Sequence, residues 1–340
     1  MKKDSSRRSP TESDVAKLAG VSQSAVSRAF TTGASIAEKT REKVLLAAEE
    51  LGYHPNLLAR SLVTNRSNII ALAISYLENP FYAQVVKELS EKLRETDRHI
   101  LLFSAPDGNQ PDPALEKVLR YQVDALILTG TRASPELKEQ CYKAGVPIVQ
   151  INRKSELSGI STVCGEDYQA AQSIAAHLLE GGHKRFAYIG GTEGSNTSRI
   201  REEGFRDYLI ANGVKNLQVA YGSNKFEAAA VEARKLLGGI MPPDAVFCAS
   251  DYMAFATMDV ARNEFGLRIP DDLSVVGFND VPDASHAAYN LTTYSQPAVA
   301  LVDEAVKLID DMIANPGGRA QKREVPGKLI IRTSSRQKSA

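Results

Sequence analysis

From residue 69 to residue 314, short apolar runs alternate with longer stretches in which apolar residues recur every three or four positions. The first pattern is typical of buried strands and the second of amphipathic helices. Because such strands separated by helices form parallel sheets covered on both faces, the pattern predicts an α/β fold, with two doubly wound subdomains favoured over one sheet. The predicted strands span 69–75, 99–104, 125–129, 147–151, 185–190, 219–221, 245–249 and 273–278, and helices are predicted near 81–96, 113–121, 134–144, 167–180, 199–212, 225–238, 251–265 and 298–314.

The N-terminal region has a different pattern, with three short amphipathic segments and little sequence between them. Thr11 and Asp14 match a capping box, which predicts that the first helix begins there. Gly20 interrupts that helix, Ser22 is suited to cap the second, and the third spans about 38–51. Two short helices joined by a tight glycine turn and packed against a third predict a helix-turn-helix. The predicted inward-facing residues are Val15, Leu18 and Ala19 in the first helix, Val26, Ala29 and Phe30 in the second, and Val44, Ala48 and Leu51 in the third.

Polar side chains cover the outward face of the second predicted helix. Arginine can make two hydrogen bonds to guanine and glutamine can make two to adenine, and the N-terminal half of a recognition helix meets base edges. A solvated helix face explains any one of these residues, but their combination within a helix-turn-helix favours DNA recognition. The predicted DNA-contacting residues of this helix are Ser22, Gln23, Ser24, Ser27 and Arg28.

Charge and composition narrow the choice of protein class. Lys and Arg total 41 and Asp and Glu total 41, which excludes a uniformly basic nucleic-acid coat and an acidic disordered chain. Residues 1–66 nevertheless carry 11 Lys or Arg and 7 Asp or Glu, which indicates a small basic module on a near-neutral body. The three scattered cysteines predict buried thiols, and no Cys/His spacing suggests a metal site. Without an apolar signal segment or a long apolar run, we expect a soluble cytoplasmic protein with no membrane span.

The chain resembles the LacI/GalR family of bacterial repressors along nearly its whole length. The resemblance is densest in three segments near the N-terminus. They are Asp14-Val-Ala-Lys-Leu-Ala-Gly-Val-Ser-Gln-Ser-Ala-Val-Ser-Arg28, Thr40-Arg-Glu-Lys-Val, and Leu51-Gly-Tyr-His-Pro-Asn-Leu-Leu-Ala-Arg-Ser-Leu62. The resemblance implies a helix-turn-helix domain over 1–54, a hinge helix or linker over 55–66, and a periplasmic-binding-protein-like core for effector binding and dimerisation over 67–340. One lobe of that core would take about 67–164 and 296–323, and the other about 166–294 and 325–335.

Residues 55–66 are too short to form a stable isolated helix in water. A plain tether is one reading. The resemblance implies instead a hinge helix that orders on DNA and enters the minor groove. Leu62 would then be the apolar wedge that unstacks a base step, and Arg60 a phosphate or groove contact.

Candidate effector residues follow from the rule that ligands of open α/β sheets bind beyond the carboxyl ends of the strands. One of the candidates given below, Asp251, is explained equally well as a residue that begins a helix. A cap or loop hydrogen bond is the alternative for the other polar residues as well. The residues that lie at predicted strand ends and match positions the resembled family uses are Asn79, Phe81, Asn152, Arg153, Arg201, Asp251 and Asn279.

Two departures from the resembled family bear on the ligand. Asn152 and Asn279 stand where neutral-sugar binders commonly have carboxylates, and Asn224 stands near the place of an aromatic stacking residue. With Arg153 and Arg201 in the same cleft, these changes favour an anionic effector such as a sugar acid. The alternative is that one arginine pairs with a structural acid such as Asp251 or Asp280.

The sequence therefore favours a transcriptional regulator, most simply a repressor, that binds a palindromic double-stranded DNA operator as a homodimer and responds to a sugar or sugar acid. We expect no cofactor, no metal and no catalytic residue. One alternative is a nucleotide-dependent enzyme, but the run Tyr188-Ile-Gly-Gly-Thr-Glu-Gly194 is a weak match to a dinucleotide-binding loop. The other is a solute-binding protein of a transporter, which would need a secretory signal in place of the basic helix-turn-helix.

Overall fold

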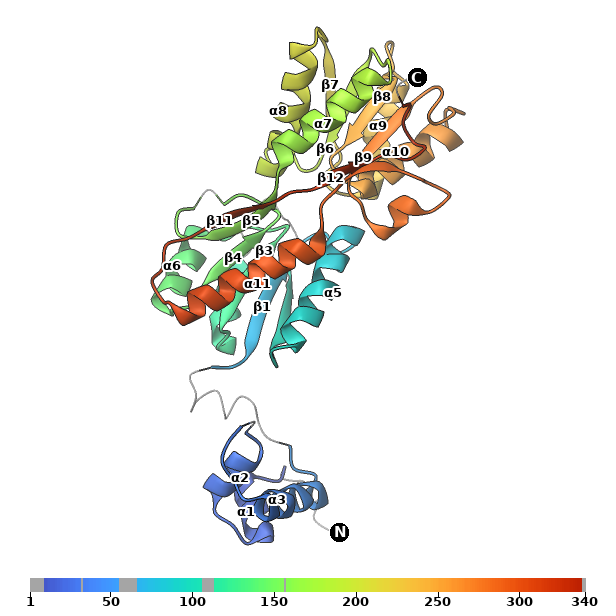
Figure 1. Cartoon of the computed structure of the whole chain (residues 1–340). Helices are drawn as coiled ribbons and strands as arrows, with labels where there is room; N and C mark the ends of the chain where they lie inside the picture. The colour runs from blue at the N-terminus through green and yellow to red at the C-terminus, as the bar shows by residue number, and fades with distance from the viewer. Residues whose placement is uncertain (1–8, 32, 55–65, 106–112, 156, 338–340) are drawn as a thin grey trace, which may run out of the picture. The chain divides into compact units, whose positions relative to one another are not determined.

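The computed structural model describes residues 9–31, 33–54, 66–105, 113–155 and 157–337. The chain divides into two compact units, Met1–Ser67 and Asn68–Ala340 (Figure 1).

The first unit contains three helices that pack around one small apolar core. The side chain of Asp14 accepts a hydrogen bond from the backbone of Thr11 at 2.9 Å, so the predicted capping box is present. Gly20 adopts a left-handed φ of 66°, which lets the chain turn sharply out of the first helix. Leu18 was expected inside but is 46% exposed, and Ala16 is buried instead. The helices are α1 (Glu12–Ala19), α2 (Gln23–Ala29) and α3 (Glu38–Leu51).

The second unit is built on two six-stranded sheets. The first sheet has the strand order β11-β5-β4-β3-β1-β2, and each of its neighbouring pairs is parallel. Its strands are β1 (Ile69–Ile74), β2 (His99–Ser104), β3 (Ala125–Thr129), β4 (Ile148–Ile151), β5 (Ser161–Gly165) and β11 (Lys322–Val325). Helices α5 (Pro80–Arg94) and α11 (Ala298–Ala314) pack on one face, and η1 (Pro113–Tyr121) and α6 (Pro135–Lys143) pack on the other.

The second sheet has the strand order β12-β10-β9-β8-β6-β7 and is parallel except where β12 runs antiparallel to β10. Its strands are β6 (Phe186–Gly190), β7 (Leu217–Tyr221), β8 (Ala245–Cys248), β9 (Ser274–Asn279), β10 (Thr292–Ser295) and β12 (Lys328–Ile330). Two pairs of helices accompany it, α7 (Asp167–Glu180) with α8 (Asn196–Ala211) and α9 (Phe226–Leu237) with α10 (Asp251–Asn263), together with the short η2 (Pro282–Ser285).

The chain passes between the two sheets three times, after β5, after β10 and after β11 (Figure 1). The carboxyl ends of the parallel strands of both sheets face the same region, because residues that follow strands of each sheet line one cleft. The predicted α/β class with doubly wound sheets is confirmed. The sequence pattern missed β5, β10, β11 and β12, and the segment 113–121 is a 3₁₀ helix. Within the described ranges, no helix is long and apolar enough to cross a membrane.

Candidate functional site

The outward face of α2 is exposed and polar, as the sequence predicts. Ser22, Gln23, Ser24, Ser27 and Arg28 are all exposed, while Val26 and Ala29 point into the core. This arrangement leaves one side of a short helix free to enter a groove of DNA.

Two of these residues also have local roles in α2. Ser22 is the N-cap, and its hydroxyl accepts a hydrogen bond from Ala25 N at 3.2 Å. The Nε atom of Arg28 donates to the carbonyl of Ser24 at 3.1 Å. In this structure Arg28 is thus held by one exposed hydrogen bond within its own helix. Arg60 and Leu62, expected to contact DNA from the hinge, lie outside the described residues.

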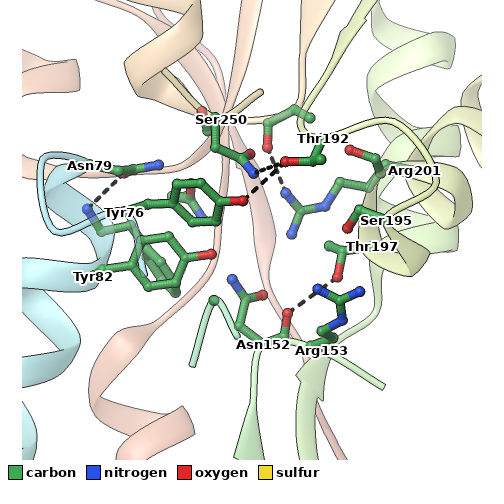
Figure 2. A pocket seen from close by; sticks show the side chains of 16 residues that line it. Tyr76, Asn79, Tyr82, Asn152, Arg153, Thr192, Ser195, Thr197, Arg201 and Ser250 are labelled. Carbon is green, nitrogen blue, oxygen red and sulfur yellow. Dashed lines mark hydrogen bonds between the residues drawn. The ribbon is translucent and has the colours of Figure 1, made fainter. Parts of the chain in front are cut away.

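A polar cleft lies where the carboxyl ends of the two sheets meet (Figure 2). The cavity at its centre measures about 40 Å³, far below the roughly 300–1,000 Å³ of typical ligand pockets. A cavity of this size does not hold a whole sugar. The cleft is lined by Tyr76, Asn79, Phe81, Tyr82, Gly130, Asn152 and Arg153 from the first sheet side, and by Thr192, Ser195, Thr197, Ser198, Arg201, Asn224, Ala249, Ser250 and Asn279 from the second.

Six of the seven predicted effector residues line this cleft. Asn79 caps α5, because its Oδ1 accepts a hydrogen bond from Phe81 N at 3.1 Å. Phe81 is 1% exposed and belongs to the core below the cleft as well as to its wall. The strand-end rule therefore gathers these residues around one cleft but also selects residues that serve the fold.

Asn152 and Asn279 are joined through the side chain of Gln296 in the crossing segment after β10. Asn279 Nδ2 donates to Gln296 Oε1 at 2.8 Å, and Gln296 Nε2 donates to Asn152 Oδ1 at 2.7 Å. All three residues are buried, so these hydrogen bonds cannot be replaced easily by water. The amide chain links the ends of β4 and β9 without any charge.

The charge of Arg201 is paired with the buried carboxylate of Asp167. The Nε atom of Arg201 donates to Asp167 Oδ1 at 2.8 Å, and its Nη1 donates to the carbonyl of Ala249 at 2.6 Å. The guanidinium carbon lies 3.5 Å from the centre of the Phe278 ring, a cation–π contact. One arginine does pair with a structural acid, but that acid is neither Asp251 nor Asp280. Asp280 instead binds Arg332 at 2.7 Å.

Asp251, also predicted as an effector residue, is not among the residues that line the cleft. Its side chain lies beneath the surface at 0% exposure and accepts hydrogen bonds from Val281 N at 2.9 Å and Thr293 Oγ1 at 2.6 Å. Burial raises the pKa of this carboxyl to about 7, and the two hydrogen bonds only partly oppose that shift. Asp251 ties α10 to β10 and to the loop after β9.

Tyr76 and Thr192 were not singled out from the sequence. The hydroxyls of these residues lie 3.0 Å apart and join the two sides of the cleft (Figure 2). Each residue follows a strand of its sheet within two positions, so the strand-end rule was a usable signal for both. Tyr82 also lines the cleft, and burial raises its pKa to about 12, so it remains a neutral phenol.

The fold and cleft define a class of protein in which a helix-turn-helix unit precedes a two-sheet, periplasmic-binding-protein-like core. Two family models agree. "Bacterial regulatory proteins, lacI family" matches residues 11–56, and "Periplasmic binding protein-like domain" matches residues 175–335.

Full-length relatives carry the assignment further. The chain is 32% identical to the HTH-type transcriptional regulator CelR of Thermobifida fusca, covering 96% of this chain and 99% of the relative. It is 29% identical to the HTH-type transcriptional repressor CytR of Escherichia coli strain K12, covering 99% of each chain.

Solved structures show the same similarity. A complex of the transcriptional regulator CelR with cellobiose aligns with a TM-score of 0.71 and 30% identity, covering 96% of this chain and 100% of that one. A lac repressor dimer bound to operator and the anti-inducer ONPF aligns with a TM-score of 0.84 and 25% identity, covering 96% and 99%. The chain therefore belongs to the LacI family and is a DNA-binding transcriptional regulator, which confirms the family predicted from its sequence.

Proposed function

We propose that this protein is a repressor that binds a palindromic operator as a homodimer and is released or recruited by a sugar or sugar acid in its cleft. The observation that carries this proposal is the cleft itself, which is polar and lies between two sheets joined by three crossing segments. A cellobiose complex and an operator-bound dimer among the similar structures support the ligand class and the mode of DNA binding. We further propose that the protein acts in the cytoplasm by binding, without catalysis.

On the DNA side, we propose that α2 is the recognition helix. Gln23, Ser24, Ser27 and Arg28 would contact bases or phosphates from its exposed face, and Ser22 would add a hydroxyl at its N-terminus. The proposed roles of Arg60 and Leu62 in the minor groove rest on the resemblance of residues 51–62 to the family.

On the ligand side, we propose that Asn79, Phe81, Asn152, Arg153, Arg201 and Asn279 surround the effector. Because the cleft is narrower than a ligand pocket, binding must change the distance between the sheets. An effector that fits one separation better than another would shift the balance between two conformations and so change the spacing of two headpieces in a dimer.

The DNA part is tested with Arg28→Ala, measured by fluorescence anisotropy on a selected operator and on scrambled DNA. We expect a loss of about 1–3 kcal/mol on the operator and a smaller loss on scrambled DNA. Lys43→Ala is the matched control, because Lys43 is an exposed cation on α3 outside the recognition helix. Equal losses on both DNAs would show that Arg28 contacts phosphate alone.

The ligand part is tested by a thermal-shift screen of sugars, sugar acids and sugar phosphates, since a ligand specific to the folded state raises the melting temperature. A compound found in this way is expected to change the operator affinity of the wild type but not of Arg153→Gln. If no compound in the screen changes operator affinity, the proposed sugar control is wrong.

A further inference from the structure

A second cavity, of about 190 Å³, lies beside the cleft and shares Arg153 with it. We propose that this side pocket binds the anionic group, a carboxylate or a phosphate, of an effector whose sugar body lies in the cleft. The proposal rests on the proposed function and names its ligand more closely. The side pocket is lined by Arg132, Ala133, Pro135, Gln150, Arg153, Lys154, Ser155 and Leu157.

Three cations converge on the side pocket because of the order of strands in the first sheet. β3 and β4 are parallel neighbours, with Thr129 paired to Ile151, so the residues that follow them emerge at one edge. Arg132 comes after β3, and Arg153 and Lys154 come directly after β4.

The cations of the side pocket are only partly compensated. The described residues of its lining include no carboxylate. Lys154 is paired with Glu324, at 2.7 Å, but Glu324 lies outside the lining. Arg132 is partly buried and makes no ion pair or hydrogen bond with any described residue. An anion bound among these three cations would form charge-assisted hydrogen bonds with them.

The N-terminus of α6 adds to the positive electrostatic potential of the side pocket. Ala133 and Pro135 line the side pocket at the N-terminus of this helix, where the helix dipole is positive. Gln150 Nε2 donates to the carbonyl of Thr131 at 2.9 Å, which fixes the segment before the helix against β4. The charged side chains and the helix end therefore favour the same kind of ligand group.

The size and position of the side pocket indicate what part of a ligand it takes. Its volume is below the roughly 300–1,000 Å³ of pockets that hold a whole ligand, so it suits a substituent. Arg153 is 7% exposed and forms part of both walls. An arginine can bind a carboxylate or phosphate through two parallel hydrogen bonds, and Arg153 lies in the wall that both cavities share.

The test compares matched ligands on the full-length protein by calorimetry. Hexoses, their uronic acids and their 6-phosphates are the probes, and the uronate and phosphate arms identify which anion is preferred. We expect an anionic member to bind at least about tenfold more tightly than its neutral parent. The ratio of the affinity for the anionic ligand to that for its neutral parent should fall towards one in Arg132→Gln. In Arg132→Lys part of this preference should remain.

Lys143→Gln is the matched control, because Lys143 is an exposed cation at the other end of α6, paired with Glu139. Operator binding by each variant reports whether it is folded. An affinity ratio near one in the wild type, or an unchanged ratio in Arg132→Gln, overturns the side pocket while leaving sugar control of DNA binding in place.

Inorganic phosphate is a second probe that needs no knowledge of the sugar. At millimolar concentration it should raise the melting temperature of the wild type and of Lys143→Gln more than that of Arg132→Gln. Equal shifts in all three proteins would overturn the proposal even if no hexose binds.

Discussion

Arg201 at the second sheet and Arg132 at the first sheet carry the same charge but lie in different surroundings. Arg201 is 4% exposed and is bound by Asp167, by a backbone carbonyl and by an aromatic ring. Arg132 is partly buried beside two further cations and contacts no acid among the described residues. An arginine whose charge is already compensated serves the fold and offers its remaining N–H groups to neutral oxygens. An arginine without compensation is available to an anion.

The largest effect is expected when the compensated pair is broken. Arg201→Ala should lower the free energy of unfolding by about 3–5 kcal/mol, because it leaves the carboxylate of Asp167 buried without its partner. Denaturant unfolding measures the change. The double variant Arg201→Met with Asp167→Leu should recover much of the loss, since no buried charge remains. A loss below about 1 kcal/mol for the single variant would contradict the structural role of Arg201.

A second test concerns the buried acid of the second sheet. The pKa of Asp251 is raised from 3.8 to about 7, so the folded state holds a proton that the unfolded state releases. Its contribution to stability is full below about pH 4 and is lost as pH rises through about 7. Relative to Asp251→Asn, which does not titrate, the wild type should therefore lose about 2–4 kcal/mol between these pH values. A difference that does not change with pH would show that the pKa of Asp251 is the same in the folded and unfolded protein.

The amide chain that links the two sheets should have a smaller effect. Gln296→Ala removes the partner of Asn279 Nδ2 and of Asn152 Oδ1, and we expect a loss of about 1–3 kcal/mol in unfolding free energy. Asn315→Ala is a control of similar chemistry, because its side chain makes one exposed hydrogen bond at 3.3 Å. The same loss in both variants would mean that the amide chain is not a specific link.

The smallest effect is expected at the uncompensated cation. Arg132→Gln should change the free energy of unfolding by less than about 0.5 kcal/mol. Because the variant removes one of three neighbouring positive charges, any change should be towards higher stability and should be larger at low salt, where charges are screened less. Measuring Arg132→Gln beside Arg201→Ala tests the comparison directly. A loss as large as that of Arg201→Ala would place Arg132 in the fold and not in a ligand site.

The three-helix unit was predictable in nearly every respect because its signals are local. The capping residues Thr11 and Ser22 and the left-handed glycines Gly20 and Gly52 lie within a few positions of the helix ends they define. Leu18 was the exception, since the side that α1 turns inward depends on how α3 packs against it.

In the core, strands made of continuous apolar residues were found, while the polar strands were missed. β10 has the sequence Thr-Thr-Tyr-Ser and is buried, because its hydroxyls find partners in distant segments. Thr293 donates to Asp251, and Thr292 donates to the carbonyl of Arg332. Such a strand has no apolar pattern to read, and its burial depends on hydrogen bonds that form only when the sheet is complete.

The strand-end rule located the cleft, because parallel strands bring their carboxyl ends together whatever residues follow them. The role of each residue there depended on partners far away in the chain. Gln296 meets Asn152 across 144 positions, and Asp167 meets Arg201 across 34. Residue types and local spacing thus established the class of regulator and the position of the cleft in which we propose that a ligand binds. Which arginine is paired with an acid and which has no acidic partner among the described residues was settled by tertiary packing, because compensation of charge is a property of neighbours in space.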